Sequence, residues 1–155
     1  MKLYRVFAYL IAAEVVIQAA AIAFGVFGEG KWIEDDGGVL NKQVLDNSDK
    51  LDFTGVVGFA IHGINGMMII PLITILFLII SFFAKVPGGT TAALLVLLFV
   101  AIQVTLGLAA HSVVWLGPLH AINAFLVIWF ALAAARRAGG TFLTGRSEPT
   151  APAAA

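Results

Sequence analysis

The sequence predicts an all-α integral membrane protein that folds as a four-helix up-down bundle. Of its 155 residues, 61% are hydrophobic and 12% are charged, which is about half the usual charged fraction. The apolar residues fall into four long runs. Each run is long enough to cross the hydrocarbon core of a bilayer, which takes about 17–25 residues. A chain of this length fits one domain, which we place at residues 1–137.

The first predicted span is formed by residues 3–27. Lys2 and Arg5 lie at its start, and small residues follow its apolar part. The same pattern is typical of a signal peptide, which is the alternative interpretation. The run is longer than the roughly 7–15 residues of a signal-peptide core, and Glu14 lies in its middle. We therefore favour a retained membrane helix. Residues 28–53 hold most of the acidic residues and predict a polar external loop.

Three further spans are predicted at residues 54–83, 92–115 and 119–135. Pro71 is expected to kink the second span, because proline lacks an amide hydrogen and clashes with the preceding turn. The short link at residues 116–118 makes the third and fourth helices antiparallel neighbours.

Residues 138–155 are rich in Gly, Ser, Thr, Pro and Ala, which is typical of a disordered tail.

Charge predicts how the chain is oriented in the membrane. In a four-span topology the acidic loop lies on one side, and both termini lie on the other. The positive-inside rule then predicts a multi-pass protein of the cell membrane with a cytoplasmic tail and cytoplasmic termini. The basic residues on the side of the termini are Lys2, Arg5, Lys85, Arg136, Arg137 and Arg146.

A short stretch of sequence occurs twice within the apolar runs. Residues 61–66 read Ile-His-Gly-Ile-Asn-Gly, and residues 119–124 read Leu-His-Ala-Ile-Asn-Ala. Each copy places a histidine and an asparagine three residues apart, on one helix face. The pairs are His62 with Asn65 and His120 with Asn123. Because a polar group inside hydrocarbon is costly, two matching pairs indicate a function.

We interpret His62 and His120 as metal ligands that face each other across the bundle, with haem b as the cofactor. The chain has no cysteine, which excludes thiolate-held iron–sulfur clusters and covalent c-type haem. Two axial histidines give a closed iron suited to electron transfer. Two alternatives stay open: structural histidines that hydrogen-bond between helices, and other metal or proton chemistry.

His111 stands near the predicted outer end of the third span. We expect it to act as an interfacial hydrogen-bond donor at the cofactor, for example to a haem propionate. A zinc site built from all three histidines is the alternative, because catalytic zinc often has three nitrogen ligands. The three histidines lack a local zinc-binding spacing, so this signal is weak.

Other polar residues in the spans predict a network near the middle of the membrane. Asn65 and Asn123 are expected to hydrogen-bond between helices. Glu14 and Gln18 are one turn apart on the first helix, and Gln103 lies at a similar depth on the third. We expect Glu14 to be protonated, or to pair with Gln103 or an asparagine. Proton uptake coupled to iron reduction, neutral packing and a partner-subunit contact are its alternative roles.

A set of residues resembles the third and fourth helices of small bacterial four-helix membrane proteins of unknown function: Gln103, Leu106-Gly107, His111, Pro118-Leu119-His120 and Asn123-Ala124. The chain is also similar, more loosely, to one half of heme A synthase over about residues 1–137. Each half of that enzyme is a four-helix bundle whose second and fourth helices carry histidines facing a haem. The resemblance implies that His62 and His120 form the axial pair.

The chain departs from heme A synthase in three respects. It has one four-helix unit, it lacks the external cysteine pair, and its Glu14 is on the wrong helix for the Glu–His motif of the catalytic half. These differences argue against heme A synthase activity.

The leading functional hypothesis is a b-type cytochrome that carries electrons near the outer face, alone or as a subunit of a respiratory complex. Its redox partner would be a membrane protein or a quinone. A non-catalytic accessory subunit is the second hypothesis, and a transporter or proton channel is the third. A stand-alone enzyme is less favoured, and the formal net charge of zero suggests no nucleic-acid partner.

Overall fold

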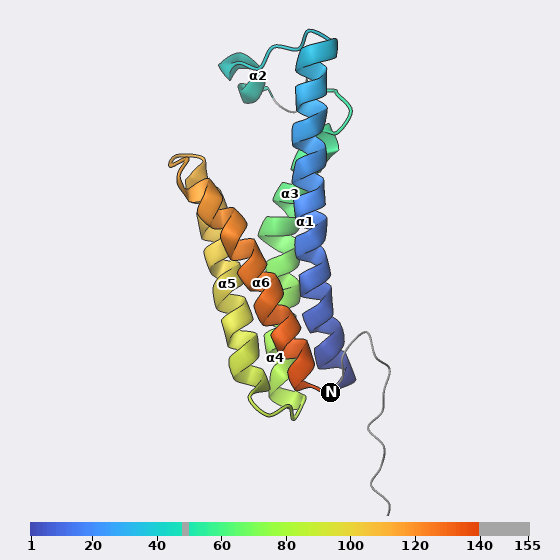
Figure 1. Cartoon of the computed structure of the whole chain (residues 1–155), viewed down its shortest axis with the longest axis vertical. Helices are drawn as coiled ribbons and strands as arrows, with labels where there is room; N and C mark the ends of the chain where they lie inside the picture. The colour runs from blue at the N-terminus through green and yellow to red at the C-terminus, as the bar shows by residue number, and fades with distance from the viewer. Residues whose placement is uncertain (48–49, 140–155) are drawn as a thin grey trace, which may run out of the picture.

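A computed structural model describes residues 1–47 and 50–139. These residues form helices joined by short links, with no β-strand among them (Figure 1). In chain order the elements are α1 (Lys2–Asp35), α2 (Lys42–Asp46), α3 (Val56–Ile64), the π-helical segment η2 (Asn65–Ile69), α4 (Ile70–Phe83), α5 (Gly89–Ala110) and α6 (Leu116–Arg137).

Four helices in the described part of the chain are long and apolar enough to cross a membrane. They are α1, the continuous helix Val56–Phe83 formed by α3, η2 and α4, then α5 and α6. The predicted all-α four-helix membrane bundle is confirmed. The chain is a multi-pass membrane protein by the length and composition of these helices.

The four long helices form an up-down bundle in which neighbours in sequence are also neighbours in space. Helix α1 packs against α6 and against α3 and α4, and α5 packs between α4 and α6. The N-terminus and the end of α6 lie at the same end of the bundle (Figure 1), where Arg5 Nη1 donates to the Gly139 carbonyl oxygen at 2.8 Å. Helix α6 is therefore diagonal to the α3–α4 helix.

The two ends of the bundle differ in charge. We call one the basic end, defined by Lys2, Arg5, Lys85, Arg136 and Arg137. We call the other the acidic end, defined by Glu29, Glu34, Asp35, Asp36, Asp46 and Asp52.

The fully buried core lies toward the basic end. Tyr4 and Phe77 are both completely buried, with ring centroids 4.7 Å apart. The Tyr4 hydroxyl donates to the Gly89 carbonyl oxygen at 2.9 Å, which ties α1 to the start of α5. Small residues at the end of α6, Ala131 and Ala134 among them, are also fully buried. Their size lets the helices approach closely at this end.

Several helix boundaries differ from the predicted ones. Helix α1 continues to Asp35, eight residues past the predicted end, where Lys31 and Asp35 form an i,i+4 ion pair that favours helix. Helix α5 ends early, at Ala110. Helix α6 begins early, at Leu116, so residues 116–118 form its first turn rather than a link. Pro118 is tolerated there because no helical donor is needed in the first turn.

Pro71 lies just after a wide π-helical turn, η2. Proline has no amide hydrogen, so one helical bond is lost near this point. The π-turn absorbs the irregularity, and α4 resumes with Pro71 in its first turn. The π-helical turn η2 begins at Asn65, which is the asparagine of the first repeated stretch. The irregular turn therefore also sets the direction of the Asn65 side chain.

Helices α1 and α3 cross at unusually close range. A Cβ atom added at Gly58 would overlap the backbone of Ala21 and Gly25. The preceding Gly55 has a φ of +105°, a conformation that L side chains rarely adopt. These two glycines let α3 begin directly against α1.

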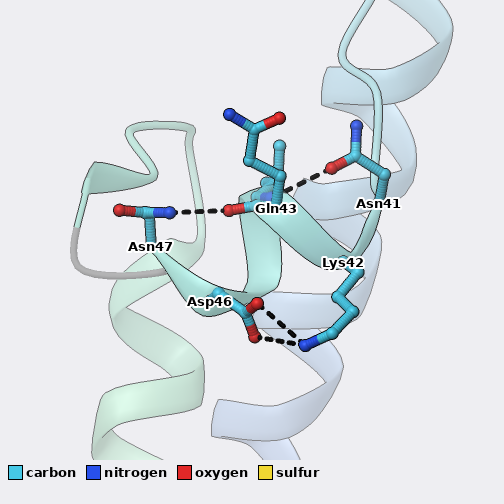
Figure 2. A network of polar contacts seen from close by, with 6 residues as sticks. Asn41, Lys42, Gln43, Asp46 and Asn47 are labelled. Carbon is cyan, nitrogen blue, oxygen red and sulfur yellow. Dashed lines mark hydrogen bonds and ion pairs between the residues drawn. The ribbon is translucent and has the colours of Figure 1, made fainter.

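Part of the described link between α1 and α3 is the short helix α2, at the acidic end. Figure 2 shows its contacts: the Asn41 side chain caps the helix by accepting from Val44 N at 3.0 Å. Lys42 and Asp46 form an ion pair at 2.8 Å, and Asn47 donates to the Gln43 carbonyl oxygen at 2.8 Å. These local bonds order part of the predicted polar loop. The predicted tail lies, from residue 140 on, outside the described residues.

Gly58→Ala should destabilise the bundle, because the added methyl group has no room against α1. We expect the free energy of unfolding to fall by about 1–3 kcal/mol, measured by denaturation in detergent micelles followed by circular dichroism. The matched control is Gly63→Ala, because a Cβ at Gly63 meets nothing within 4 Å. Equal losses in both variants would contradict the close crossing.

Candidate functional site: a histidine pair between two helical hairpins

The structure brings His62 of α3 and His120 of α6 together across the diagonal of the bundle. Their ring centroids are 6.2 Å apart, and the ring planes are inclined by 65°. Both side chains are half-buried. The two histidines of the repeated stretch therefore lie beside each other, although they are far apart in the chain and on helices that are not direct neighbours.

Each histidine is held by a backbone carbonyl of the neighbouring helix. His62 Nδ1 is 3.1 Å from the Gln18 carbonyl oxygen of α1. His120 Nδ1 is 3.0 Å from the Gln103 carbonyl oxygen of α5. A carbonyl oxygen only accepts, so each neutral ring must carry its proton on Nδ1. The lone pair is then on Nε2 in both histidines.

In the hairpin of α5 and α6, the polar groups around His120 satisfy one another. Gln103 Nε2 donates to His120 Nε2 at 3.2 Å. Asn123 Nδ2 donates to Gln103 Oε1 at 2.7 Å and to the Phe99 carbonyl oxygen at 2.9 Å. Gln103 thus bridges the histidine and the asparagine.

In the hairpin of α1 and α3, the same residue types are connected differently. Gln18 Nε2 donates to the His62 carbonyl oxygen at 2.9 Å. Asn65 Nδ2 donates to Glu14 Oε2 at 2.9 Å. Gln18 Oε1 is consequently buried without a hydrogen-bond partner among the described residues, and His62 Nε2 also lacks one there. Of the partners expected for Glu14, the structure selects an asparagine.

The hairpin of α1 and α3 and the hairpin of α5 and α6 resemble each other in their polar contacts. The resemblance extends to the first helix of each hairpin. In each hairpin, the backbone carbonyl oxygen of a glutamine on the first helix is hydrogen-bonded to the histidine on the second helix. The two hairpins run in the same direction along the bundle (Figure 1). The histidine–asparagine repeat was visible in the sequence, whereas the role of the glutamines was missed. A shared dipeptide was the available signal, Ile17-Gln18 and Ile102-Gln103.

The site lies where the close packing of the bundle ends. Asn65 and Asn123 are 8% and 5% exposed, whereas the histidines one turn nearer the acidic end are half-buried. Helix α3 packs against α1 and makes at most isolated contacts with α5 and α6. The two hairpins diverge toward the acidic end (Figure 1). The histidine pair therefore sits at the junction of the packed and the divergent halves.

Glycines near the histidines have two different roles. A Cβ at Gly107 would lie 3.0 Å from His120 Cε1, so glycine lets this ring rest against α5. Gly66 similarly makes room for the Gln18 amide. Gly63 and Gly117 instead border open space, with nothing within 4 Å of an added Cβ.

His111 is not part of this cluster. It caps the end of α5, its side chain is exposed, and it makes no side-chain hydrogen bond to the pair. Within residues 1–47 and 50–139, no three His, Cys, Asp or Glu side chains come together as a metal site. The three-histidine zinc alternative is therefore not assembled in the structure.

Comparison with protein-family models, with curated proteins and with solved structures finds no match to this chain. The function is therefore argued from the geometry of the histidine site.

The hydrogen bond between Gln103 and Asn123 should be measurable as an energetic coupling. In a double-mutant cycle of Gln103→Leu and Asn123→Leu, we expect a coupling energy of about 0.6–1.7 kcal/mol in the free energy of unfolding. The equivalent pair Gln18 and Asn65 is not bonded, so the same two substitutions there should be additive. Equal coupling in both hairpins would contradict the two different networks.

Proposed function

We propose that this chain is a membrane b-type haem protein in which His62 and His120 are the two axial ligands. The observation that supports the proposal is the histidine pair: two half-buried imidazoles whose centroids are 6.2 Å apart, each with Nδ1 committed to a backbone carbonyl. Both rings therefore have the tautomer that a metal bound through Nε2 requires.

The distance between the rings suits a single shared metal. A metal–nitrogen bond to imidazole is about 2.0–2.1 Å long, so two rings bound to one ion place their centroids about 6 Å apart. The observed separation of 6.2 Å is of this size, and it also lies within the range of an ordinary edge-to-face pair of rings.

The backbone carbonyls of Gln18 and Gln103 would act on the ligands as well as orient them. A metal-bound histidine commonly donates its other ring N–H to a carbonyl or carboxylate, which fixes the ring and raises its basicity. Both histidines already make this bond, at 3.1 and 3.0 Å. Main-chain acceptors in the middle of helices cannot rotate away, so the orientation is stable.

One contact has to change for ligation. Gln103 Nε2 donates to His120 Nε2 at 3.2 Å, which is the atom that would bind iron. Rotation of the Gln103 amide would free the lone pair of His120 Nε2. Asn123 would still donate to the Phe99 carbonyl oxygen. His62 Nε2 needs no such change, because it has no hydrogen-bond partner in the described part of the chain.

A haem held by two histidines supplies one-electron exchange at a six-coordinate iron. The site lies in the acidic half of the bundle, because His120 comes only four residues after the start of α6 at Leu116. If the positive-inside rule holds, the basic end faces the cytoplasm. The chain would then sit in the cell membrane and exchange electrons near the outer face, alone or within a respiratory complex.

One observation favours a second candidate, a non-catalytic accessory subunit. Gln103, His120 and Asn123 satisfy one another's hydrogen bonds within the hairpin of α5 and α6. Such a network can join helices for structural reasons alone. Helix α1 also extends into the acidic end as far as Asp35, where a partner protein would contact it.

The absorption spectrum separates the two candidates. Full-length protein made with ample haem should show a Soret band and, after reduction, sharp α and β bands of a six-coordinate low-spin haem. His62→Ala or His120→Ala should remove the six-coordinate spectrum, because each removes an axial ligand. His111→Ala is the control, and its spectrum should be unchanged since His111 lies outside the pair.

Folded protein with no haem spectrum would overturn the haem proposal in favour of the accessory subunit. A spectrum that survives both single substitutions would place the haem elsewhere. Circular dichroism of every variant checks that the helices remain formed.

A further inference from the structure

A groove lies on the outer face of α1 and α3, apart from the histidine pair. It has a volume of about 480 Å³ and is lined mainly by aliphatic side chains, with two polar residues, Glu14 and Asn65, at its wall. Ile17, Val57 and Ile64 in its lining are each about half exposed, and α3 has no further long helix over this face. In a membrane, the groove therefore opens toward lipid.

Glu14 brings an unused hydrogen-bond acceptor to this groove. Its Oε2 accepts from Asn65 at 2.9 Å, and its Oε1 has no partner among the described residues. An ionisable side chain at such a place is costly unless it is paired or neutral. Asn65 has a second N–H to offer, because a side-chain amide carries two donors. The groove can thus both accept and donate a hydrogen bond.

The second hairpin has no equivalent feature. The position that corresponds to Glu14 holds Phe99, and Asn123 there donates to the Phe99 carbonyl and to Gln103. Glu14 is therefore a side-chain acceptor that the second hairpin lacks. Asn65 could instead have donated to Gln18 Oε1, which is left unpartnered.

Depth in the bilayer restricts what can occupy the groove. Glu14 follows Lys2, the first residue of α1, by about 12 residues, or about 18 Å along the axis. Since the hydrocarbon core is about 30 Å thick, Glu14 lies near its middle. Phospholipid headgroups do not reach this level. The occupant must be soluble in hydrocarbon and must carry a hydroxyl or carbonyl group.

We propose that this groove binds the ring of a lipid-soluble quinol or quinone. Glu14 Oε1 accepts a hydrogen bond from the quinol hydroxyl, and the free N–H of Asn65 donates to the quinone oxygen. The aliphatic lining contacts the ring and the start of the isoprenoid tail. The choice of a quinone over another hydrocarbon-soluble alcohol rests on the proposed haem function, because Asn65 lies one helical turn from His62.

Photolabelling tests this site without relying on activity. Full-length protein in phosphatidylcholine nanodiscs is illuminated with an azido-quinone, and the labelled peptides are mapped by mass spectrometry. We expect saturable labelling of α1 and α3 that decylubiquinol suppresses. Glu14→Gln should weaken this protection about tenfold, the equivalent of about 1.4 kcal/mol, because a neutral amide oxygen accepts a hydrogen bond more weakly than a carboxylate does.

Ile64→Trp and Ile122→Trp form a matched pair of variants. The two isoleucines hold equivalent positions in the repeat, and both are 58% exposed, but only Ile64 lines the groove. Ile64→Trp should fill the groove and abolish labelling, whereas Ile122→Trp should leave it unchanged. Labelling that is unaffected by Ile64→Trp and Glu14→Gln, or that maps to other helices, overturns the proposal.

The haem spectrum of the same samples distinguishes failure of this site from failure of the proposed function. A haem spectrum without groove labelling overturns the quinone site and leaves the haem protein standing. Groove labelling in protein that binds no haem supports the quinone site and overturns the haem function.

Discussion

The bond from each histidine Nδ1–H to a main-chain carbonyl of the neighbouring helix is the interaction on which the site depends. The acceptors, at Gln18 and Gln103, belong to residues in the middle of helices. A carbonyl oxygen has two lone pairs, so it can accept this bond in addition to its helical one. The same contact sets the register of each hairpin and leaves Nε2 of its histidine unprotonated. Helix packing and ligand chemistry are thereby coupled.

The two hairpins use this common bond in different surroundings. In the second hairpin, Asn123 and Gln103 satisfy each other, and the network is closed. In the first, Asn65 turns to Glu14, which leaves Gln18 Oε1 without a partner. The repeat therefore keeps the position of the histidine in both hairpins but differs in the polar groups around it. The groove at Glu14 lies on the side where the network is open.

Packing along the bundle explains why the site is where it is. Toward the basic end, small residues of α6 such as Ala131 allow close approach, and large side chains such as Tyr4 and Phe77 fill the interior. Toward the acidic end, the first hairpin is held together by Gly58 and its neighbours, independently of the second. A rigid half thus anchors the helices, and the half beyond it leaves space beside the histidines.

The sequence by itself determined the membrane class, the four spans and the matched histidine–asparagine pairs, because hydropathy and a short repeat are properties of neighbouring residues. For Glu14 it offered protonation, Gln103 or an asparagine, and the structure pairs Glu14 with Asn65. Only the tertiary structure decided that the rings of His62 and His120 lie 6.2 Å apart and that backbone carbonyls hold them. The rotation and spacing of helices depend on close contacts between helices, such as that of Gly58 with α1. These contacts join distant parts of the chain and leave no periodic pattern in the sequence. For the same physical reason His111, nine residues before His120 in the sequence, lies outside the site.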